Sequence, residues 1–144
     1  MKAFFSFMVI STSLFALTFE DAAKSLKNKE YSKAQQQLMQ LALQEDSKAQ
    51  YNLGLMNYKG LGVPTDMELA VFWYKQAAQS GNPQAMNNLG HMYHLGQGVN
   101  KDIQKAKELY QASAKQGYAL AQLNLAMLYE KSLKKENLEK AYEW

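Results

Sequence analysis

Apolar residues recur along the chain at a spacing that predicts a series of amphipathic helices. Within residues 47–59, Leu53 and Met56 lie three positions apart and therefore on one face of a helix. A second apolar face follows in residues 67–80, where the regularly spaced residues are Ala70, Trp73, Tyr74 and Ala77. The pattern predicts an all-α chain of short helices joined by tight turns.

The helical pattern repeats with a period of 36 residues. The sequence GLGVPTD at residues 60–66 returns as GQGVNKD at residues 96–102. When three alanines are aligned, at Ala49, Ala85 and Ala121, the residues that follow also coincide: Asn52, Asn88 and Asn124, then Leu53, Leu89 and Leu125. A period in the thirties is typical of stacked repeats, in which one helix pair cannot bury its apolar face without neighbours.

Polar residues indicate where the second helix of each pair begins. Asp66 and Asp102 suit a helix start, because a carboxylate there interacts favourably with the helix dipole. Thr65 and Glu68 have the spacing of a capping box. The sequence therefore predicts a helix that starts immediately after each repeated loop.

Glycines fall at two kinds of position in the repeat. Gly81 and Gly117 follow the second helices and fit C-terminal caps. Gly54 and Gly90 lie inside the first helices, where glycine costs about 0.5–1 kcal/mol relative to alanine. We therefore expect a neighbouring helix to approach closely at these two positions.

The repeat resembles the Sel-like repeat, a relative of the tetratricopeptide repeat. In the first copy the matching residues are Ala49, Leu53, Gly54, Gly60, Gly62, Val63, Asp66, Ala70, Trp73, Tyr74, Ala77, Ala78 and Gly81. The copies depart from the family pattern at Asn57, where tyrosine is usual, and at Leu109, where tryptophan is usual. The resemblance implies a right-handed α-solenoid of stacked antiparallel helix pairs.

The pattern divides the chain into five segments. These are a signal peptide or anchor at 1–18, a degenerate helix pair at 19–46 that turns at Asn28, complete copies at 47–82 and 83–118, and a partial copy at 119–144. The partial copy has Ser132 and Lys134 in place of the loop glycines. We expect its loop to be one residue shorter, which would put Ala141 and Trp144 at the core positions of a second helix. The end at Trp144 fits a natural short cap or a truncated reading frame.

The N-terminus carries an apolar segment. Lys2 precedes an uncharged stretch from Ala3 to Phe19, which is short for a membrane span and fits the apolar region of a secretory signal peptide. Cleavage after Thr18 and an uncleaved anchor are the two alternatives. In either case we expect a periplasmic or secreted protein, in which membrane contact is made only through an uncleaved N-terminal segment. The chain has no cysteine, so no disulfide supports the fold.

Charge and composition argue against several functions. The formal net charge is +3, and all 16 basic residues are lysine. Specific readout of guanine and bidentate phosphate recognition depend on arginine. We therefore expect no nucleic-acid partner, and no cofactor motif is present.

Two short patterns are candidates for chemistry. His91 and His94 lie three residues apart on one helix, a spacing that suits a metal, but no third ligand is visible in the sequence. Residues 132–135 match S-x-x-K, a nucleophile motif of penicillin-recognising enzymes, yet they fall in the expected loop and lack the accompanying motifs. Asp66 and Asp102 are explained by capping. No metal site and no catalytic residue are predicted.

A concave groove is the predicted binding site. In tetratricopeptide arrays the first helix of each pair lines the concave face, and by that resemblance the groove residues here are Asn52, Asn88, Asn124, Tyr51, Tyr58, His91 and His94. An asparagine amide both donates and accepts, which suits the backbone of an extended peptide. The alternative is that the asparagines bond a neighbouring helix.

Two functions remain open from the sequence. The first is a non-enzymatic scaffold or adaptor that binds an envelope or secreted protein or peptide, and we expect it to be a monomer. The second is a β-lactamase-type, penicillin-binding hydrolase, an activity attributed to exported cysteine-rich members of the family. In those members a disulfide links the two helices of each pair, and this chain, which has no cysteine, cannot form one.

Overall fold

The computed structural model describes the chain from residue 17 to residue 142, and its side chains as far as residue 136. This part of the chain is entirely helical and consists of α1 (Phe19–Lys27), α2 (Tyr31–Ala42), α3 (Ser47–Lys59), α4 (Met67–Gln79), α5 (Pro83–Leu95), α6 (Ile103–Lys115) and α7 (Ala119–Tyr142). The helices predicted at 47–59 and 67–80 are confirmed to within one residue.

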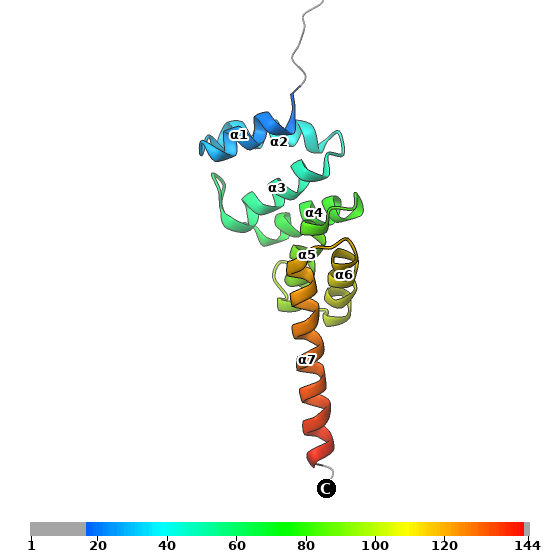
Figure 1. Ribbon diagram of the computed structural model, residues 1–144. Coiled ribbons are helices and arrows are strands. Elements are labelled where there is room, and N and C mark those ends of the chain that lie inside the picture. The colour runs from blue at the N-terminus through cyan, green and yellow to red at the C-terminus, as the bar shows by residue number, and fades with distance from the viewer. Residues whose placement is uncertain (1–16, 143–144) are drawn as a thin grey trace, which may run out of the picture.

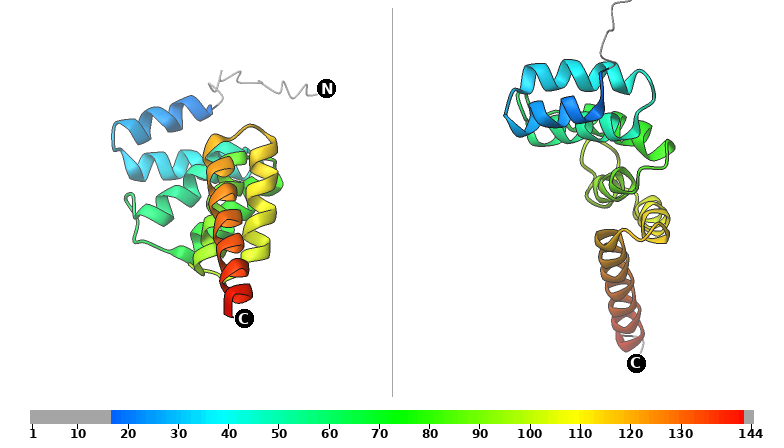
Figure 2. Two further views of the ribbon diagram at one scale, coloured as in Figure 1. Left: turned by 60° about the horizontal axis from the view of Figure 1, so that its bottom comes forward. Right: turned by 45° about the horizontal axis from the view of Figure 1, so that its top comes forward.

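The helices form a stack in which each packs mainly against its neighbours in the chain (Figure 1). α1 with α2, α3 with α4, and α5 with α6 make three successive antiparallel pairs, and α7 packs against α6. Figure 2 shows the pairs following one another and α7 projecting from the end of the stack. The predicted all-α solenoid is confirmed.

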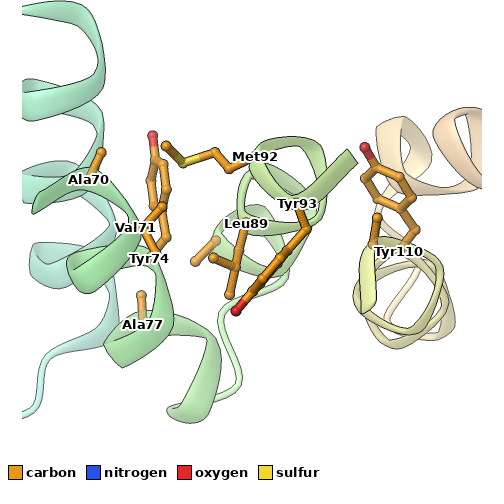
Figure 3. Packing of buried hydrophobic residues seen from close by; sticks show 10 residues of the cluster. Ala70, Val71, Tyr74, Ala77, Leu89, Met92, Tyr93 and Tyr110 are labelled. Atoms are coloured by element: carbon orange, nitrogen blue, oxygen red, sulfur yellow. The ribbon is translucent and has the colours of Figure 1, made fainter. Parts of the chain in front are cut away.

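The apolar core runs through the stack as two clusters. The N-terminal cluster joins α1, α2 and α3, and its buried residues include Leu38, Leu53 and Met56. The second joins α4, α5 and α6, where Tyr74 and Tyr110 are its largest fully buried side chains (Figure 3). Each cluster draws residues from more than one pair, so no pair has a complete core of its own.

The mid-helix glycines admit a tyrosine ring from the second helix of the same pair. A Cβ at Gly54 would lie 2.6 Å from Cδ1 of Tyr74, and a Cβ at Gly90 would lie 2.9 Å from Cε1 of Tyr110. Both rings are almost fully buried and have little room to move away. The close approach expected at these glycines is confirmed, and burial of a ring offsets the cost of glycine in a helix.

The second glycine of each loop packs against the preceding pair. A Cβ at Gly62 would overlap Tyr31, the first residue of α2, and a Cβ at Gly98 would overlap the backbone of Met67, the first residue of α4. Tyr31 and Met67 are 36 residues apart, so α1 and α2 stack in the same register as the complete copies. The loop therefore recurs because it holds one pair against the next.

Asp66 and Asp102 start α4 and α6 as predicted. Each is the N-cap residue, and its side chain accepts a hydrogen bond from a backbone N–H of the first turn, at 2.9 Å in both cases. The capping box predicted from Thr65 and Glu68 is wrong. Asp66 takes the extended backbone of the N-cap, which places Glu68 one position too early to bond back.

A capping box does occur where the chain enters α1. The N–H of Asp21 donates to Thr18 Oγ1 at 3.3 Å, and the N–H of Thr18 donates to Asp21 Oδ2 at 2.9 Å. Leu17 and Phe19 pack against the N-terminal cluster. The last two residues of the predicted signal segment at 1–18, Leu17 and Thr18, thus contact the helices. Residues 1–16 of that segment lie outside the described part of the chain.

The loop predicted in the third copy is absent, because α7 continues through Ser132 and Lys134 as one helix of 24 residues. The loops after α3 and α5 begin with glycines at positive φ, at Gly60 and Gly96, whereas this segment has no glycine and contains good helix formers. Ala141 consequently belongs to α7 itself, and Trp144 lies beyond the described residues. No helix in the described range is both long and apolar enough to cross a membrane.

The buried tyrosines predict how stability depends on alkaline pH. Burial raises the pKa of the Tyr110 phenol to about 12, whereas in the unfolded chain the usual pKa is about 10. This contribution to the free energy of unfolding is therefore complete below pH about 10 and is lost as the pH rises toward about 12. Urea denaturation across this range should show a steeper decline for the wild type than for Tyr110→Phe. Parallel pH profiles would contradict the assignment.

Candidate functional site

A hollow of about 270 Å³ lies where the first helices of the pairs face one another. α3, α5 and the start of α7 form its walls, and the residues that line it are Tyr51, Leu55, Tyr58, Lys59, Tyr74, Asn88, His91, Tyr118 and Leu120. Four of the seven predicted groove residues, Tyr51, Tyr58, Asn88 and His91, are among them. The structure therefore brings together the central part of the predicted site.

Aromatic rings dominate the walls of the hollow. The rings of Tyr51 and Tyr74 lie 5.9 Å apart between centroids and are tilted by 35°. Tyr74 comes from α4 and Tyr118 from the turn before α7, so the sequence prediction, which considered only first helices, missed both. The sequence did carry one clue to Tyr74: a glycine inside α3, Gly54, indicates that a bulky side chain of a neighbouring helix packs against it.

Two of the phenol groups that line the hollow, those of Tyr51 and Tyr74, are held neutral. Burial raises the pKa of Tyr74 well above its ordinary value, and the nearby Asn88 side chain opposes that shift. Burial also raises the pKa of Tyr51, to which Tyr118 adds. The Tyr74 hydroxyl is buried and has no hydrogen-bond partner among the described residues. The hollow therefore offers neutral phenols and the Asn88 amide as hydrogen-bonding groups, and His91 and Lys59 also line it.

Asn52 lies in a neighbouring cleft of about 550 Å³ rather than in the hollow. This cleft runs from Phe19 across the start of α3 to the turn at residues 80–82 and the first residues of α5, and Tyr51 lines both cavities. The Asn52 amide donates to the carbonyl oxygen of Lys48 in its own helix at 2.8 Å. Its amide oxygen remains available to a ligand.

Asn88 and Asn124 are connected through Asn87. The Asn124 amide donates to Asn87 Oδ1 at 2.8 Å, and the Asn87 amide donates to Asn88 Oδ1 at 3.4 Å. Asn87 is only 2% exposed. The chain of amides ties α7 to α5, and Asn88 at one end of it lines the hollow. The bond to a neighbouring helix is therefore confirmed for Asn124, whereas binding of a peptide backbone by the asparagines stays a prediction.

His94 lies in a third cavity, about 600 Å³ in volume, between the end of α5 and α7. Four lysines line this cavity, at Lys101, Lys131, Lys134 and Lys135. Burial lowers the pKa of His94, and Lys131 adds to the effect. His91 and His94 therefore face different cavities, and the described residues contain no group of three or more side chains able to hold a metal.

The S-x-x-K match lies on a helix and not in a loop, which corrects the prediction. Ser132 and Lys135 are exposed on α7, one turn apart. Lys134, within the same turn, pairs with Glu130 at 2.6 Å. Neither residue of the match lines the hollow.

The sequence and the fold both match known proteins. The profile of the Sel1 repeat matches residues 47–82, 83–118 and 119–144. A Sel1 repeat protein from Oxalobacter formigenes is 32% identical, with a TM-score of 0.76 over 80% of this chain and 47% of that chain. A protective antigen present in uropathogenic Escherichia coli strains, which displays an SLR fold, is 32% identical, with a TM-score of 0.67 over 69% of this chain and 21% of its own.

A cysteine-rich relative shares the fold alone. The cysteine-rich protein B of Helicobacter pylori is 18% identical, with a TM-score of 0.61 over 71% of this chain and 92% of that chain. Comparison with curated proteins gives no match. This chain spans less than half the length of the first two structures.

Proposed function

This chain belongs to the Sel1 repeat family, and from that premise we propose that it is an exported scaffold that binds an extended peptide segment of a partner protein in the hollow between α3, α5 and α7. Sel1 repeat proteins generally mediate protein–protein interactions. The observation that carries the proposal is the convergence of Tyr51, Tyr58, Asn88 and His91 on one hollow.

The chemistry of the hollow favours a peptide over a small cofactor. Its volume of about 270 Å³ lies just below the roughly 300–1,000 Å³ of small-molecule sites. The Asn88 amide can bond a backbone, while the tyrosines accept an apolar or aromatic side chain. Because the cleft that contains Asn52 adjoins the hollow at Tyr51, a peptide could run from one cavity to the next.

Export is part of the same proposal. The uncharged stretch from Ala3 to Phe19 supports a secretory signal, and it is followed by a helical body that starts at α1. The partner would then be an envelope or secreted protein in the periplasm or outside the cell. Capture by the purified chain should accordingly be tried with the envelope fraction.

A displayed peptide library tests the site. Peptides selected on the wild-type chain should bind the double variant Tyr58→Ala/Asn88→Ala about tenfold more weakly, since each lost hydrogen bond removes about 0.5–1.5 kcal/mol and the aromatic contact is lost as well. Binding is measured by fluorescence anisotropy, and folding by circular dichroism.

The matched control is Glu68→Ala, an exposed residue of α4 that lines neither the hollow nor the other cavities described here. It should leave peptide affinity unchanged within about twofold, as surface substitutions usually have small effects. If no peptide is enriched, or if enriched peptides bind the folded double variant as well as the wild type, the hollow is not the binding site.

A further inference from the structure

A second cleft lies between α4 and α6, with α5 as its floor. It has a volume of about 490 Å³, and its apolar lining consists of Ala78, Met86, Leu89, Leu109 and Ala112. Figure 3 shows Leu89 and Tyr93 extending from the same side of α5. None of these residues lines the hollow proposed above for peptides. A cleft of this size and composition is typical of small-molecule sites.

The cleft coincides with a tryptophan position of the repeat. Leu109 stands where the preceding pair has Trp73, 36 residues earlier. Trp73 packs against the N-terminal cluster, which contains Ala42 and Leu53, the counterparts of Ala78 and Leu89. In one pair an indole therefore packs against the core at this position, and in the next pair the smaller leucine lines an open cleft.

The rim of the cleft also differs between the two pairs. The preceding pair has apolar residues at the three equivalent positions, Met39, Leu69 and Phe72, whereas the cleft has Lys75, Lys105 and Glu108. The two pairs therefore differ in the charge around this opening, and only the second pair has groups there that can pair with a charged ligand.

Two ammonium groups stand over one ring at the opening. Lys75 Nζ lies 5.9 Å and Lys105 Nζ 5.2 Å from the centroid of the Tyr93 ring, which is almost fully buried. Glu108 is the one acidic residue among those that line the cleft, and its carboxylate accepts a hydrogen bond from Gln104 at 3.0 Å. The opening carries a net positive charge, which complements an anion.

We propose that this cleft binds a small aromatic carboxylate. Its planar ring would occupy the volume that Trp73 fills in the preceding pair, against Leu89 and Leu109. Its carboxylate would lie between Lys75 and Lys105. The site is independent of whatever binds in the hollow.

The test titrates two matched probes, indole-3-acetate and its neutral amide indole-3-acetamide, into the full chain labelled at the methionine methyl groups. Both probes should shift the Met86 resonance, which is assigned with Met86→Leu. The carboxylate should bind about fivefold more tightly than the amide, as expected for partly exposed ion pairs. The double variant Lys75→Gln/Lys105→Gln should bind both probes with the lower affinity of the amide.

Leu109→Trp is the decisive variant, because it restores the residue that covers the core in the preceding pair. It should remain folded and abolish the Met86 response to both probes, while Leu123→Trp, an exposed residue on α7, should bind as the wild type does. If Leu109→Trp does not fold, Ala112→Leu, which fills the cleft from the next turn of α6, should likewise abolish the Met86 response. Equal binding to a folded, filled variant, or no Met86 shift at millimolar probe, would overturn the proposal.

Discussion

Replacing Gly98 with alanine is expected to destabilise the protein by about 3 kcal/mol or more, which is a large effect for a single methyl group. Gly98 has a φ of +65°, and a Cβ there would overlap the carbonyl group of Met67 and lie 2.9 Å from the backbone nitrogen of Glu68. Those atoms belong to the first turn of α4, so relief requires the two pairs to move apart. Urea denaturation followed by circular dichroism measures the loss.

Gly81→Ala is the matched control for this prediction. Gly81 also has a positive φ, +83°, but no atom lies within 4 Å of a Cβ built there. It should therefore lose only the conformational advantage of glycine, about 1–2 kcal/mol. The difference between the two variants measures the contact between pairs, and equal losses would show that the loop does not hold the stack together.

Where the sequence carries both the apolar period and the loop glycines, it predicts the fold well. The spacing of apolar residues predicts where α3 and α4 run, and the glycines that follow them, Gly60 and Gly81, predict where they end, because both adopt a positive φ. The error at Thr65 concerns a choice between adjacent residues with capping side chains. That choice depends on which residue takes the extended backbone at the N-cap, and spacing alone does not specify it.

The third copy shows the limit of extending a repeat by alignment. Ala121 and Leu125 keep the register of the first helix, and the profile of the family continues to residue 144. The turn, however, depends on residues that adopt positive φ, and Ser132 and Lys134 replace them. The segment therefore stays helical instead of forming the turn of the repeat. The missing loop also leaves Ile103 43% exposed, whereas its counterpart Met67 is covered by the loop at Gly98.

The candidate site was predicted only along the first helices. Residues three positions apart, such as His91 and His94, share a face of a helix, but they lie almost one turn apart along its axis and can therefore meet different neighbours. His91 lines the hollow, whereas His94 faces α7 and the lysines near it. Tyr74 and Tyr118 reach the hollow from outside the first helices, and only the packing of one pair on the next brings them there.

Asn87→Ala is expected to cost about 2 kcal/mol and to loosen the start of α7, because it leaves partners of a buried amide without their hydrogen bonds. Asn87 accepts from Asn124 at 2.8 Å and donates to Asn88 at 3.4 Å, and it is almost fully buried. Amide hydrogen exchange should become faster at residues 119–126, while exchange in α3 should remain close to that of the wild type.

Asn52→Ala is the matched control, because Asn52 occupies the same repeat position as Asn88 and Asn124 but takes no part in the chain of amides. The Asn52 amide bonds only within its own helix, to the carbonyl oxygen of Lys48, and its side chain is half-buried. Its replacement should change stability by no more than about 0.5 kcal/mol. Asn124→Ala should reproduce the local loosening of α7, because it removes the other end of the same bond. If Asn87→Ala costs no more than Asn52→Ala and exchange in α7 is unchanged, the amide chain does not hold α7 on the stack.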